Sequence, residues 1–387
     1  MIMKRKAVLW VLGFSVLVVA VLVFVAVLTV YVDPFFHYHE PRTDEFYYSL
    51  DNQRSQSDGI VKHFDYQGII TGTSMTENFR TTEAYGLFDC RFVKVPLSGA
   101  TFKEISDLLE TALNANPDLR IIIRGLDITR LGNDPDQMRT DLGEYPTYLY
   151  DNDLFNDIHY VFSREVVFSR VYTMVRDRSD PYICPGITHF NEYSNWMDDE
   201  AWTFGRKTLY PDGVTVEEPR HHPERADIDM GSVRENIRQN VAALAEAWPD
   251  VTFYCFFTPY SAKWWQTELE AMRLDQNIEA ERIAIEELLK YDNIRLFSFN
   301  NLTNITTDLN NYKDATHYGD WINSLILRYM YDGKGLLTAE NYEAYLEEER
   351  QFYSTFDYTL LNGQEDYEDD SLAAQLLYDE IYSFPDE

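Results

Sequence analysis

The chain has 387 residues, a formal net charge of −32 and a hydrophobic content of 45%, with 23 Phe, 28 Tyr and 7 Trp. This apolar content is sufficient for a large core and excludes a disordered stalk. The net charge argues against nucleic acid or an anionic lipid surface as the partner, because both would repel the chain. Three cysteines, Cys90, Cys184 and Cys255, are too few for a disulfide framework, although one pair remains open.

The first distinctive segment runs from Ala7 to Val32 without a charged side chain. As a helix these 26 residues would reach about 39 Å, more than the ~30 Å hydrocarbon core of a bilayer. A cleaved signal peptide is the alternative, but the apolar run is about twice the length of a typical signal core and no small-x-small site follows it. Lys4, Arg5 and Lys6 precede the run, so the positive-inside rule predicts a cytoplasmic N-terminus and an extracytoplasmic remainder.

Five short apolar runs then predict buried strands. They are Gly68–Gly72, Arg91–Val95, Leu119–Ile123, Val251–Phe257 and Ile294–Ser298. Helical periodicity separates or follows them at 101–116, 232–248, about 267–290 and 318–331. The alternation of strands and helices, with strands covered on both faces, predicts an α/β fold with a doubly wound parallel sheet.

The rest of the chain divides into expected segments around this regular part. We predict a cytoplasmic N-terminus at 1–6, a transmembrane anchor at 7–32 and a connecting arm at 33–60. The extracytoplasmic domain is predicted over 61–350, with a large insertion after the third strand at about 131–230, where regular patterning breaks. Residues 351–387 are predicted to be an acidic C-terminal tail, because the nine charged residues from Glu365 onward are all acidic.

Gly72-Thr73-Ser74 follows the first strand, at the carboxyl edge where open α/β sheets place their sites. A serine in such a crevice is a candidate nucleophile if a base activates it. The structural alternative is a capping box, in which Ser74 and Glu77 cap the start of the next helix. The motif alone favours the cap.

Asp314 and His317 lie after the last strand, at the same edge of the sheet. With the first strand expected near the centre of the sheet, the two loops can meet. The three-residue spacing allows the imidazole to face Ser74 while the carboxylate holds the other ring nitrogen. An isolated Asp-x-x-His pair is more often a polar cap, but its coincidence with a strand-end serine favours catalysis.

These motifs together resemble the SGNH (GDSL-like) hydrolase superfamily. The resemblance implies a flavodoxin-like three-layer sandwich, with Ser74 as nucleophile, His317 as general base and Asp314 as its partner. It also implies an oxyanion hole formed by the Ser74 amide, a glycine after the second strand and an asparagine after the third. Gly99 matches the glycine, whereas Asp127 stands where the asparagine is expected.

The resemblance covers roughly residues 66–127 and 232–332 and departs from the family at the third donor. An ionised carboxylate beside a developing oxyanion would destabilise it, so Asp127 would need to be protonated or turned away, or Asn133 or Arg124 would have to replace it. Arg124 has a structural alternative, which is to pair with Asp127. All three side chains are therefore candidates for substrate contact.

An outward-facing domain on a single-pass anchor is also the layout of acyltransferase-like members of this superfamily, such as D-alanyl transfer and alginate acetylation proteins. By analogy we expect a membrane-anchored serine esterase or O-acyltransferase that acts on cell-envelope polysaccharide or a lipid-linked substrate. The alternative is a non-catalytic surface binding or assembly protein, which Asp127 favours.

Two further groups of residues are candidates for binding roles. Trp264 and Trp265, after the fourth strand, are candidates for a sugar-binding cleft, with aromatic packing as the alternative. His221, His222 and Glu224 lie in one polar loop, but adjacent histidines point in different directions, which disfavours a metal site. No Walker-type or dinucleotide-binding glycine loop is present, so we expect no cofactor and no metal.

Overall fold

The structure is a computed structural model that describes residues 2–141, 145–151, 153–198, 202–210, 214–222 and 226–367. The chain forms two compact units, each assembled from two separate stretches. The first unit comprises Met1–Phe64 and Gly143–His189, and the second comprises Asp65–Leu142 and Phe190–Glu387. The predicted insertion at 131–230 is therefore shared between the units.

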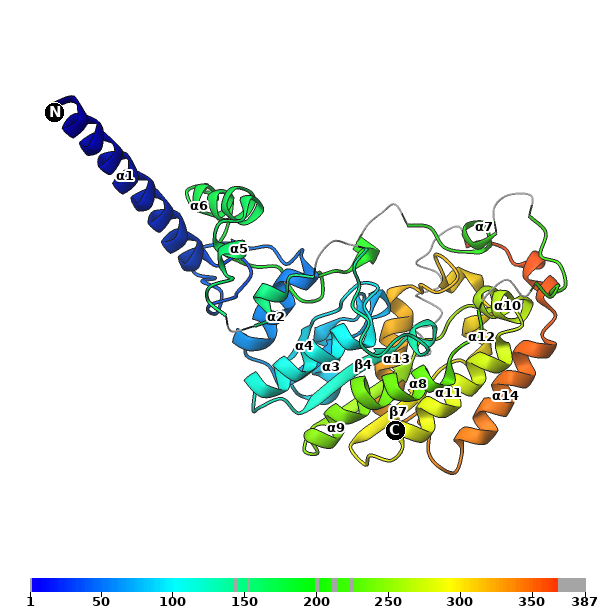
Figure 1. Cartoon of the computed structure of the whole chain (residues 1–387). Helices are drawn as coiled ribbons and strands as arrows, with labels where there is room; N and C mark the ends of the chain where they lie inside the picture. The colour runs from blue at the N-terminus through cyan, green and yellow to red at the C-terminus, as the bar shows by residue number, and fades with distance from the viewer. Residues whose placement is uncertain are drawn as a thin grey trace. The chain divides into compact units, whose positions relative to one another are not determined.

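The first unit is built around the N-terminal helix α1, Ile2–Val32, which Figure 1 shows in blue. Its part from Arg5 to Val32 is long and apolar enough to cross a membrane, and most of its side chains are exposed. The remaining elements of this unit are short. They are β1 (Tyr47–Tyr48), α2 (Gln53–His63), η3 (Thr147–Leu149), α5 (Ile158–Val161), η4 (Glu165–Val171), α6 (Tyr172–Asp177) and β5 (Gly186–Ile187), with β1 and β5 paired in parallel.

The predicted irregular arm at 33–60 contains β1 and most of helix α2. Hydrophobic periodicity missed α2 because three successive residues of its buried face are polar: Gln56, Ser57 and Asp58. Polar burial of this kind leaves no signal in a pattern of apolar residues.

The second unit contains a five-stranded parallel sheet with the order β3-β2-β4-β6-β7. Its strands are β2 (Gly68–Thr71), β3 (Phe92–Lys94), β4 (Ile121–Leu126), β6 (Thr252–Phe257) and β7 (Ile294–Ser298). All five correspond to predicted runs, which confirms the predicted α/β fold class. Numbered within the sheet, the order is 2-1-3-4-5, the flavodoxin-like arrangement. The chain reverses its direction of winding between β2 and β4, which is where such sheets bind ligands.

Helices cover both faces of this sheet, because every residue of β2 and β3 is buried although successive side chains point to opposite faces. The main helices are α3 (Thr81–Phe88), α4 (Phe102–Ala115), α8 (Met230–Ile237), α9 (Ala243–Ala247), α10 (Ala262–Glu270), α11 (Leu274–Leu288), α13 (Asp320–Asp332) and α14 (Tyr342–Thr355). Helix α3 packs against α13, whereas α11 packs against α8 and α14 (Figure 1).

Shorter helical segments of the second unit connect these elements. They are η1 (Ser74–Thr76), η2 (Ile128–Arg130), η5 (Trp196–Asp198), α7 (Arg206–Leu209), η6 (Arg238–Ala242), α12 (Thr303–Thr306), η7 (Leu309–Asn311) and η8 (Tyr358–Gly363). The predicted helix at 267–290 is in fact two helices, because Met272 has a φ of 59° and breaks the chain direction between α10 and α11.

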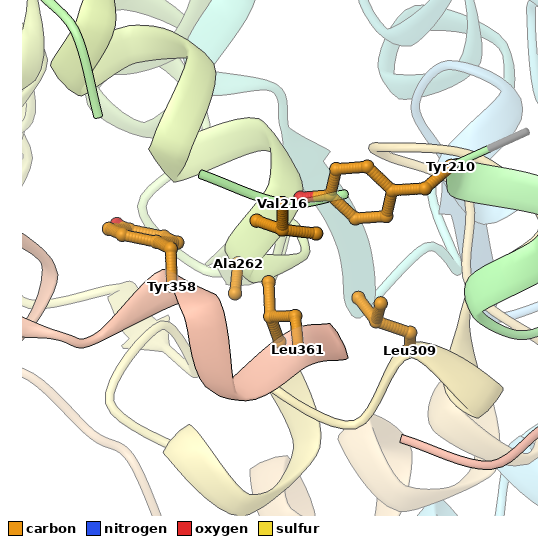
Figure 2. Packing of buried hydrophobic residues seen from close by; sticks show 6 residues of the cluster. All are labelled: Tyr210, Val216, Ala262, Leu309, Tyr358 and Leu361. Carbon is orange, nitrogen blue, oxygen red and sulfur yellow. The ribbon is translucent and has the colours of Figure 1, made fainter. Parts of the chain in front are cut away.

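The C-terminal boundary also differs from the expected one. Residue 351, the predicted start of the tail, lies inside α14, and the chain continues into η8. Figure 2 shows one core cluster formed by this segment together with the part of the chain predicted as insertion. Its members are Tyr210, Val216, Ala262, Leu309, Tyr358 and Leu361. The chain is thus packed onto the fold at least as far as Leu361, because the side chains of Tyr358 and Leu361 are fully buried.

Candidate active site

The turn after β2 presents Ser74 at the start of a helical segment. Gly72 has a φ of 154°, and a Cβ at this position would lie 2.7 Å from Thr76 Cγ2, so only glycine fits this turn. Thr73 caps η1, since its hydroxyl accepts from the Met75 N–H at 3.4 Å. The capping box between Ser74 and Glu77, which is the structural alternative, is not formed, because Ser74 Oγ contacts His317 instead. The serine is therefore available for chemistry.

Helix α13 and the residues just before it hold this turn in place. The Met75 carbonyl accepts a hydrogen bond from Asn323 Nδ2 at 3.0 Å and one from the Tyr318 hydroxyl at 3.5 Å. Asn323 and Tyr318 are each 1% exposed, so these donors are held by the core. The turn that carries Ser74 is consequently tied to the segment that carries His317.

The loop before α13 is a tight hairpin that brings Asp314 and His317 to the sheet edge. Tyr312 and Tyr318 pair across it as an antiparallel bridge, and Ser261 holds its tip by donating from Oγ to the Ala315 carbonyl at 2.7 Å. The sequence predicts a central position for the first strand of the sheet, β2. In the structure β2 instead lies next to the edge strand β3. The contact is made because the 21 residues between β7 and α13 return across the sheet edge.

Ser74, His317 and Asp314 form a continuous hydrogen-bonded chain. Ser74 Oγ lies 2.8 Å from His317 Nε2, and His317 Nδ1 lies 2.8 Å from Asp314 Oδ2. The imidazole is about one-quarter exposed and the carboxylate about half exposed. In this geometry one ring nitrogen can accept the serine proton while the other donates to the carboxylate.

Asp314 is held as an acceptor by four donors. Its Oδ1 accepts from the N–H of His317 at 2.8 Å, the N–H of Thr316 at 2.9 Å and the Thr316 hydroxyl at 3.1 Å. Partial burial acts to raise the pKa of the Asp314 carboxyl, but the hydrogen bonds and charge of His317 outweigh it and lower the pKa well below its usual range. The carboxylate stays ionised at neutral pH and fixes the ring orientation.

Two backbone N–H groups are available beside the serine. In the described part of the chain, the N–H groups of Ser74 and Gly99 donate to no protein acceptor, and both residues line the same small cleft of about 110 Å³. Gly99 has a φ of 61°, and a Cβ there would lie 2.0 Å from Arg139 Nη1. The positive φ favours glycine at this position, which matches the glycine that the resemblance implies.

Asp127, where the resemblance implies an asparagine, also lines the cleft and is 4% exposed. Its carboxylate accepts hydrogen bonds from the hydroxyls of Thr73 and Tyr260 and a long one of 3.5 Å from Thr258 Oγ1. Burial and the neighbouring carboxylate raise the pKa of the Tyr260 phenol well above its usual range, so Tyr260 stays a donor. Three hydroxyl groups therefore hold the carboxylate.

Comparisons with known proteins add little to this geometry. No protein-family model and no curated protein matches the chain. A solved structure described as "a putative platelet activating factor from Streptococcus pneumonia" overlaps 73% of this chain and 90% of its own, with 9% sequence identity and a TM-score of 0.37. A likeness this weak carries no argument about function, so the case for function rests on the site.

The structure adds residues to the site that sequence reasoning missed. Arg130 and Thr129 line the cleft from η2, directly after Asp127. Trp196 packs edge-on against the His317 ring, with centroids 6.2 Å apart, and the Lys313 ammonium lies 3.6 Å from the Trp196 ring centroid. Arg130 follows the end of β4 and could have been inferred from that position, whereas Trp196 lies in a region without regular patterning.

Several predicted substrate contacts lie elsewhere. Arg124 is 1% exposed and donates to the carbonyls of Asn240 at 2.6 Å and Phe102 at 3.3 Å. Arg124 and Asp127 are three residues apart, and side chains at that spacing along a strand point to opposite sides of the sheet. It does not pair with Asp127, and burial lowers the pKa of the Arg124 guanidinium to about 10. Asn133 lies in a turn, where its N–H donates to the Arg130 carbonyl, and does not line the cleft.

The tryptophan pair also has a structural role. Trp264 and Trp265 are 6% and 0% exposed, and neither lines the cleft. Trp265 stacks on Tyr353 of α14 with a centroid distance of 4.4 Å, and Trp264 packs on Tyr260 at 4.8 Å. The alternative of aromatic packing therefore describes them, and they support the site only through Tyr260.

The described residues contain no cluster of three or more metal-binding side chains. The backbone N–H of His222 donates to the Glu270 carbonyl, whereas Glu224 lies outside the described residues. Cys90, Cys184 and Cys255 are all free thiols.

Proposed function

We propose that this chain is a membrane-anchored, extracytoplasmic serine esterase or O-acyltransferase of the SGNH type, acting on cell-envelope polymers. The observation that carries the proposal is the hydrogen-bonded chain from Ser74 through His317 to Asp314, with 2.8 Å at each link. It lies at the carboxyl edge of a parallel sheet, beside the switch between β2 and β4.

The proposed reaction proceeds in two halves. Ser74 Oγ attacks the ester carbonyl carbon as its proton passes to His317 Nε2, and the leaving alcohol departs with that proton as the acyl-enzyme forms. The N–H groups of Ser74 and Gly99 are proposed to stabilise the negative charge on the carbonyl oxygen. In the second half, water or a glycan hydroxyl attacks the acyl-enzyme. Hydrolase and transferase differ only in this acceptor.

The class of substrate follows from the proposed anchor. If α1 spans the membrane with residues 1–6 in the cytoplasm, the catalytic unit reaches only what lies near the outer face. Cell-envelope polysaccharide and lipid-linked precursors are the esters or hydroxyl acceptors concentrated there, so we favour them over diffusible esters. The insertion residue Trp196, beside His317, offers an aromatic face suited to a sugar ring.

Asp127 favours a second candidate, a non-catalytic binding or assembly protein that retains the fold. A carboxylate held in the cleft by Thr73 and Tyr260 supplies negative charge where an oxyanion would develop. This arrangement disfavours acyl transfer relative to an amide at the same position. The two candidates make opposite predictions for the reactivity of Ser74.

A fluorophosphonate probe applied to the full-length protein in detergent separates them. The proposal predicts stoichiometric labelling that Ser74→Ala abolishes and His317→Ala reduces by at least about a hundredfold. Ser354→Ala, which changes an exposed serine on α14, is the matched control and should label like the parent. A folded protein that is not labelled would contradict the enzyme and support the binding role.

A further inference from the structure

The membrane-proximal segment, defined here as residues 154–178, carries a row of exposed apolar side chains. These side chains are Leu154, Phe155, Ile158, Phe162, Phe168, Tyr172 and Val175. Phe168 and Tyr172, on consecutive turns of η4 and α6, are 65% and 60% exposed. Side chains of this size gathered on one short segment mark an interaction surface rather than an ordinary exterior.

This segment is fixed to the end of α1 within the first unit. Thr29 Oγ1 donates to the Val161 carbonyl at 3.3 Å. The Tyr160 hydroxyl accepts from the Phe35 N–H at 3.2 Å and donates to Asp33 Oδ1 at 2.7 Å. Tyr160 and Asp33 are fully buried, so these contacts hold α5 firmly at the point where the long apolar helix ends.

An apolar groove of about 140 Å³ lies where the segment packs on α1. Helix α1 contributes Val25, Leu28 and Thr29 to the groove, and the segment contributes residues that include Phe168 and Tyr172. Val25, Leu28 and Thr29 belong to the part of α1 that is long and apolar enough to cross a membrane. If α1 spans the membrane, any group that covers the groove therefore lies at the same membrane depth as the last turns of α1.

The opposite face of the same segment is polar. Ser169, Arg170 and Thr173 face a separate cavity of about 520 Å³, which Glu45 and Asp51 also line. Arg170 forms an ion pair with Asp51 across a distance of 2.6 Å. The segment is therefore amphipathic, with an apolar face toward α1 and polar side chains on the opposite side, as in helices that lie in a membrane interface.

The depth of the contact agrees with an interfacial position. The span Arg5–Val32 has 28 residues and a length of about 42 Å, so a ~30 Å hydrocarbon core centred on it would end near Leu28. The groove residues Val25 and Thr29 bracket this boundary. Interfacial helices bury their apolar face about 5–10 Å into the same region.

The local charge also permits a lipid surface. Although the whole chain carries a net charge of −32, residues 154–178 contain four arginines and three acidic residues. Arg170 and Arg178 are paired with acidic residues, so the local surface is close to neutral or weakly basic. The repulsion expected from the overall composition is therefore weaker at this segment.

We propose that the membrane-proximal segment lies in the bilayer leaflet at which α1 ends, with lipid acyl chains filling the groove beside Phe168 and Tyr172. The inference rests on α1 spanning the membrane, which is part of the proposed function. It assigns this unit a second membrane contact in addition to the anchor.

The test uses the full-length protein with Cys184 changed to Ser, since the other two cysteines are buried. Single cysteines introduced by Phe168→Cys and Tyr172→Cys carry an environment-sensitive fluorophore in vesicles of phosphatidylcholine and phosphatidylglycerol. Leu17→Cys, in the middle of α1, reports on insertion of the anchor. Met272→Cys, at an exposed apolar residue of the second unit, is the control for exposure.

Lipids brominated near the glycerol end of the acyl chain should quench labels at 168 and 172 several-fold more than the label at 272, and aqueous iodide should quench them less. If the label at 17 is quenched by lipids brominated near the end of the acyl chain while those at 168 and 172 behave like the label at 272, the inference is overturned and the anchor stands. That result would leave the exposed face for a protein partner. If the label at 17 is also water-exposed, the anchor and the inference fail together.

Discussion

Exchanging Asp314 for Asn should slow the proposed reaction of Ser74 more than exchanging it for Ala. Three donors fix Oδ1, namely the N–H groups of Thr316 and His317 and the Thr316 hydroxyl, at 2.8–3.1 Å. In the D314N variant the amide oxygen takes this position, so the amide nitrogen faces His317 Nδ1. That ring nitrogen must then accept a hydrogen bond, which places the ring proton on Nε2. The atom that should accept the Ser74 proton is thereby blocked.

The magnitudes follow from the same contacts. Loss of the carboxylate removes its attraction for the imidazolium, about 4 kcal/mol at 4 Å and an effective dielectric of 20, and half-exposure of Asp314 reduces this to about 1–2 kcal/mol. D314A should therefore react roughly fivefold to thirtyfold more slowly. D314N suffers the same loss. To restore the productive ring proton, its amide must also rotate away from three donors, each worth about 1 kcal/mol. We expect D314N to be slower than D314A by a further factor of about 10².

The assay is the second-order rate constant of fluorophosphonate labelling at pH 7, measured on full-length D314A and D314N. Thermal unfolding of both variants controls for folding. A D314N variant that labels as fast as D314A, or faster, would refute the reasoning from the amide orientation.

Three further changes test the surroundings of the site and the core. Asp127→Asn removes a charge from the cleft, a screened interaction worth about 1 kcal/mol, so labelling should accelerate roughly fivefold; slower labelling would contradict this. Gly99→Ala places a Cβ against Arg139 at a φ of 61°, so labelling should fall at least about tenfold and the unfolding temperature should drop; an unchanged variant would show that the turn adapts. Burial raises the pKa of Glu349 to about 8 beside the buried Glu281, so the folded state holds more protons than the unfolded state between about pH 4.3 and 8 and stability falls as pH rises across that window. Glu281→Gln should therefore raise the unfolding temperature at pH 8.5 and leave it nearly unchanged at pH 5. Equal shifts at both pH values would contradict the raised pKa values of this buried pair.

The sheet could be predicted from the sequence because its strands are short apolar runs with helical periodicity between them. The position of Ser74 followed from the same pattern, since a residue directly after a parallel strand must emerge at the carboxyl edge. Its contact with His317 was harder to foresee. β2 is not central, and the contact depends on a loop whose path is set by the Tyr312–Tyr318 bridge and by Ser261.

The remaining features depend on contacts that no local pattern carries. Gln56 and its polar neighbours hide helix α2, and the division of the predicted insertion between two units follows from long-range packing. Trp264 and Trp265 looked like a binding face because they follow a strand end, yet stacking on Tyr353 of α14 buries them. Trp196 takes the aromatic position beside His317 instead.

The most direct measurement of the central claim is peptide mapping of the full-length protein after reaction with a fluorophosphonate. The account predicts one covalent adduct, on Ser74, that disappears in Ser74→Ala and is strongly reduced in His317→Ala. An adduct on another residue, or no adduct on a folded protein, would contradict the proposal that Ser74, His317 and Asp314 act as a catalytic triad.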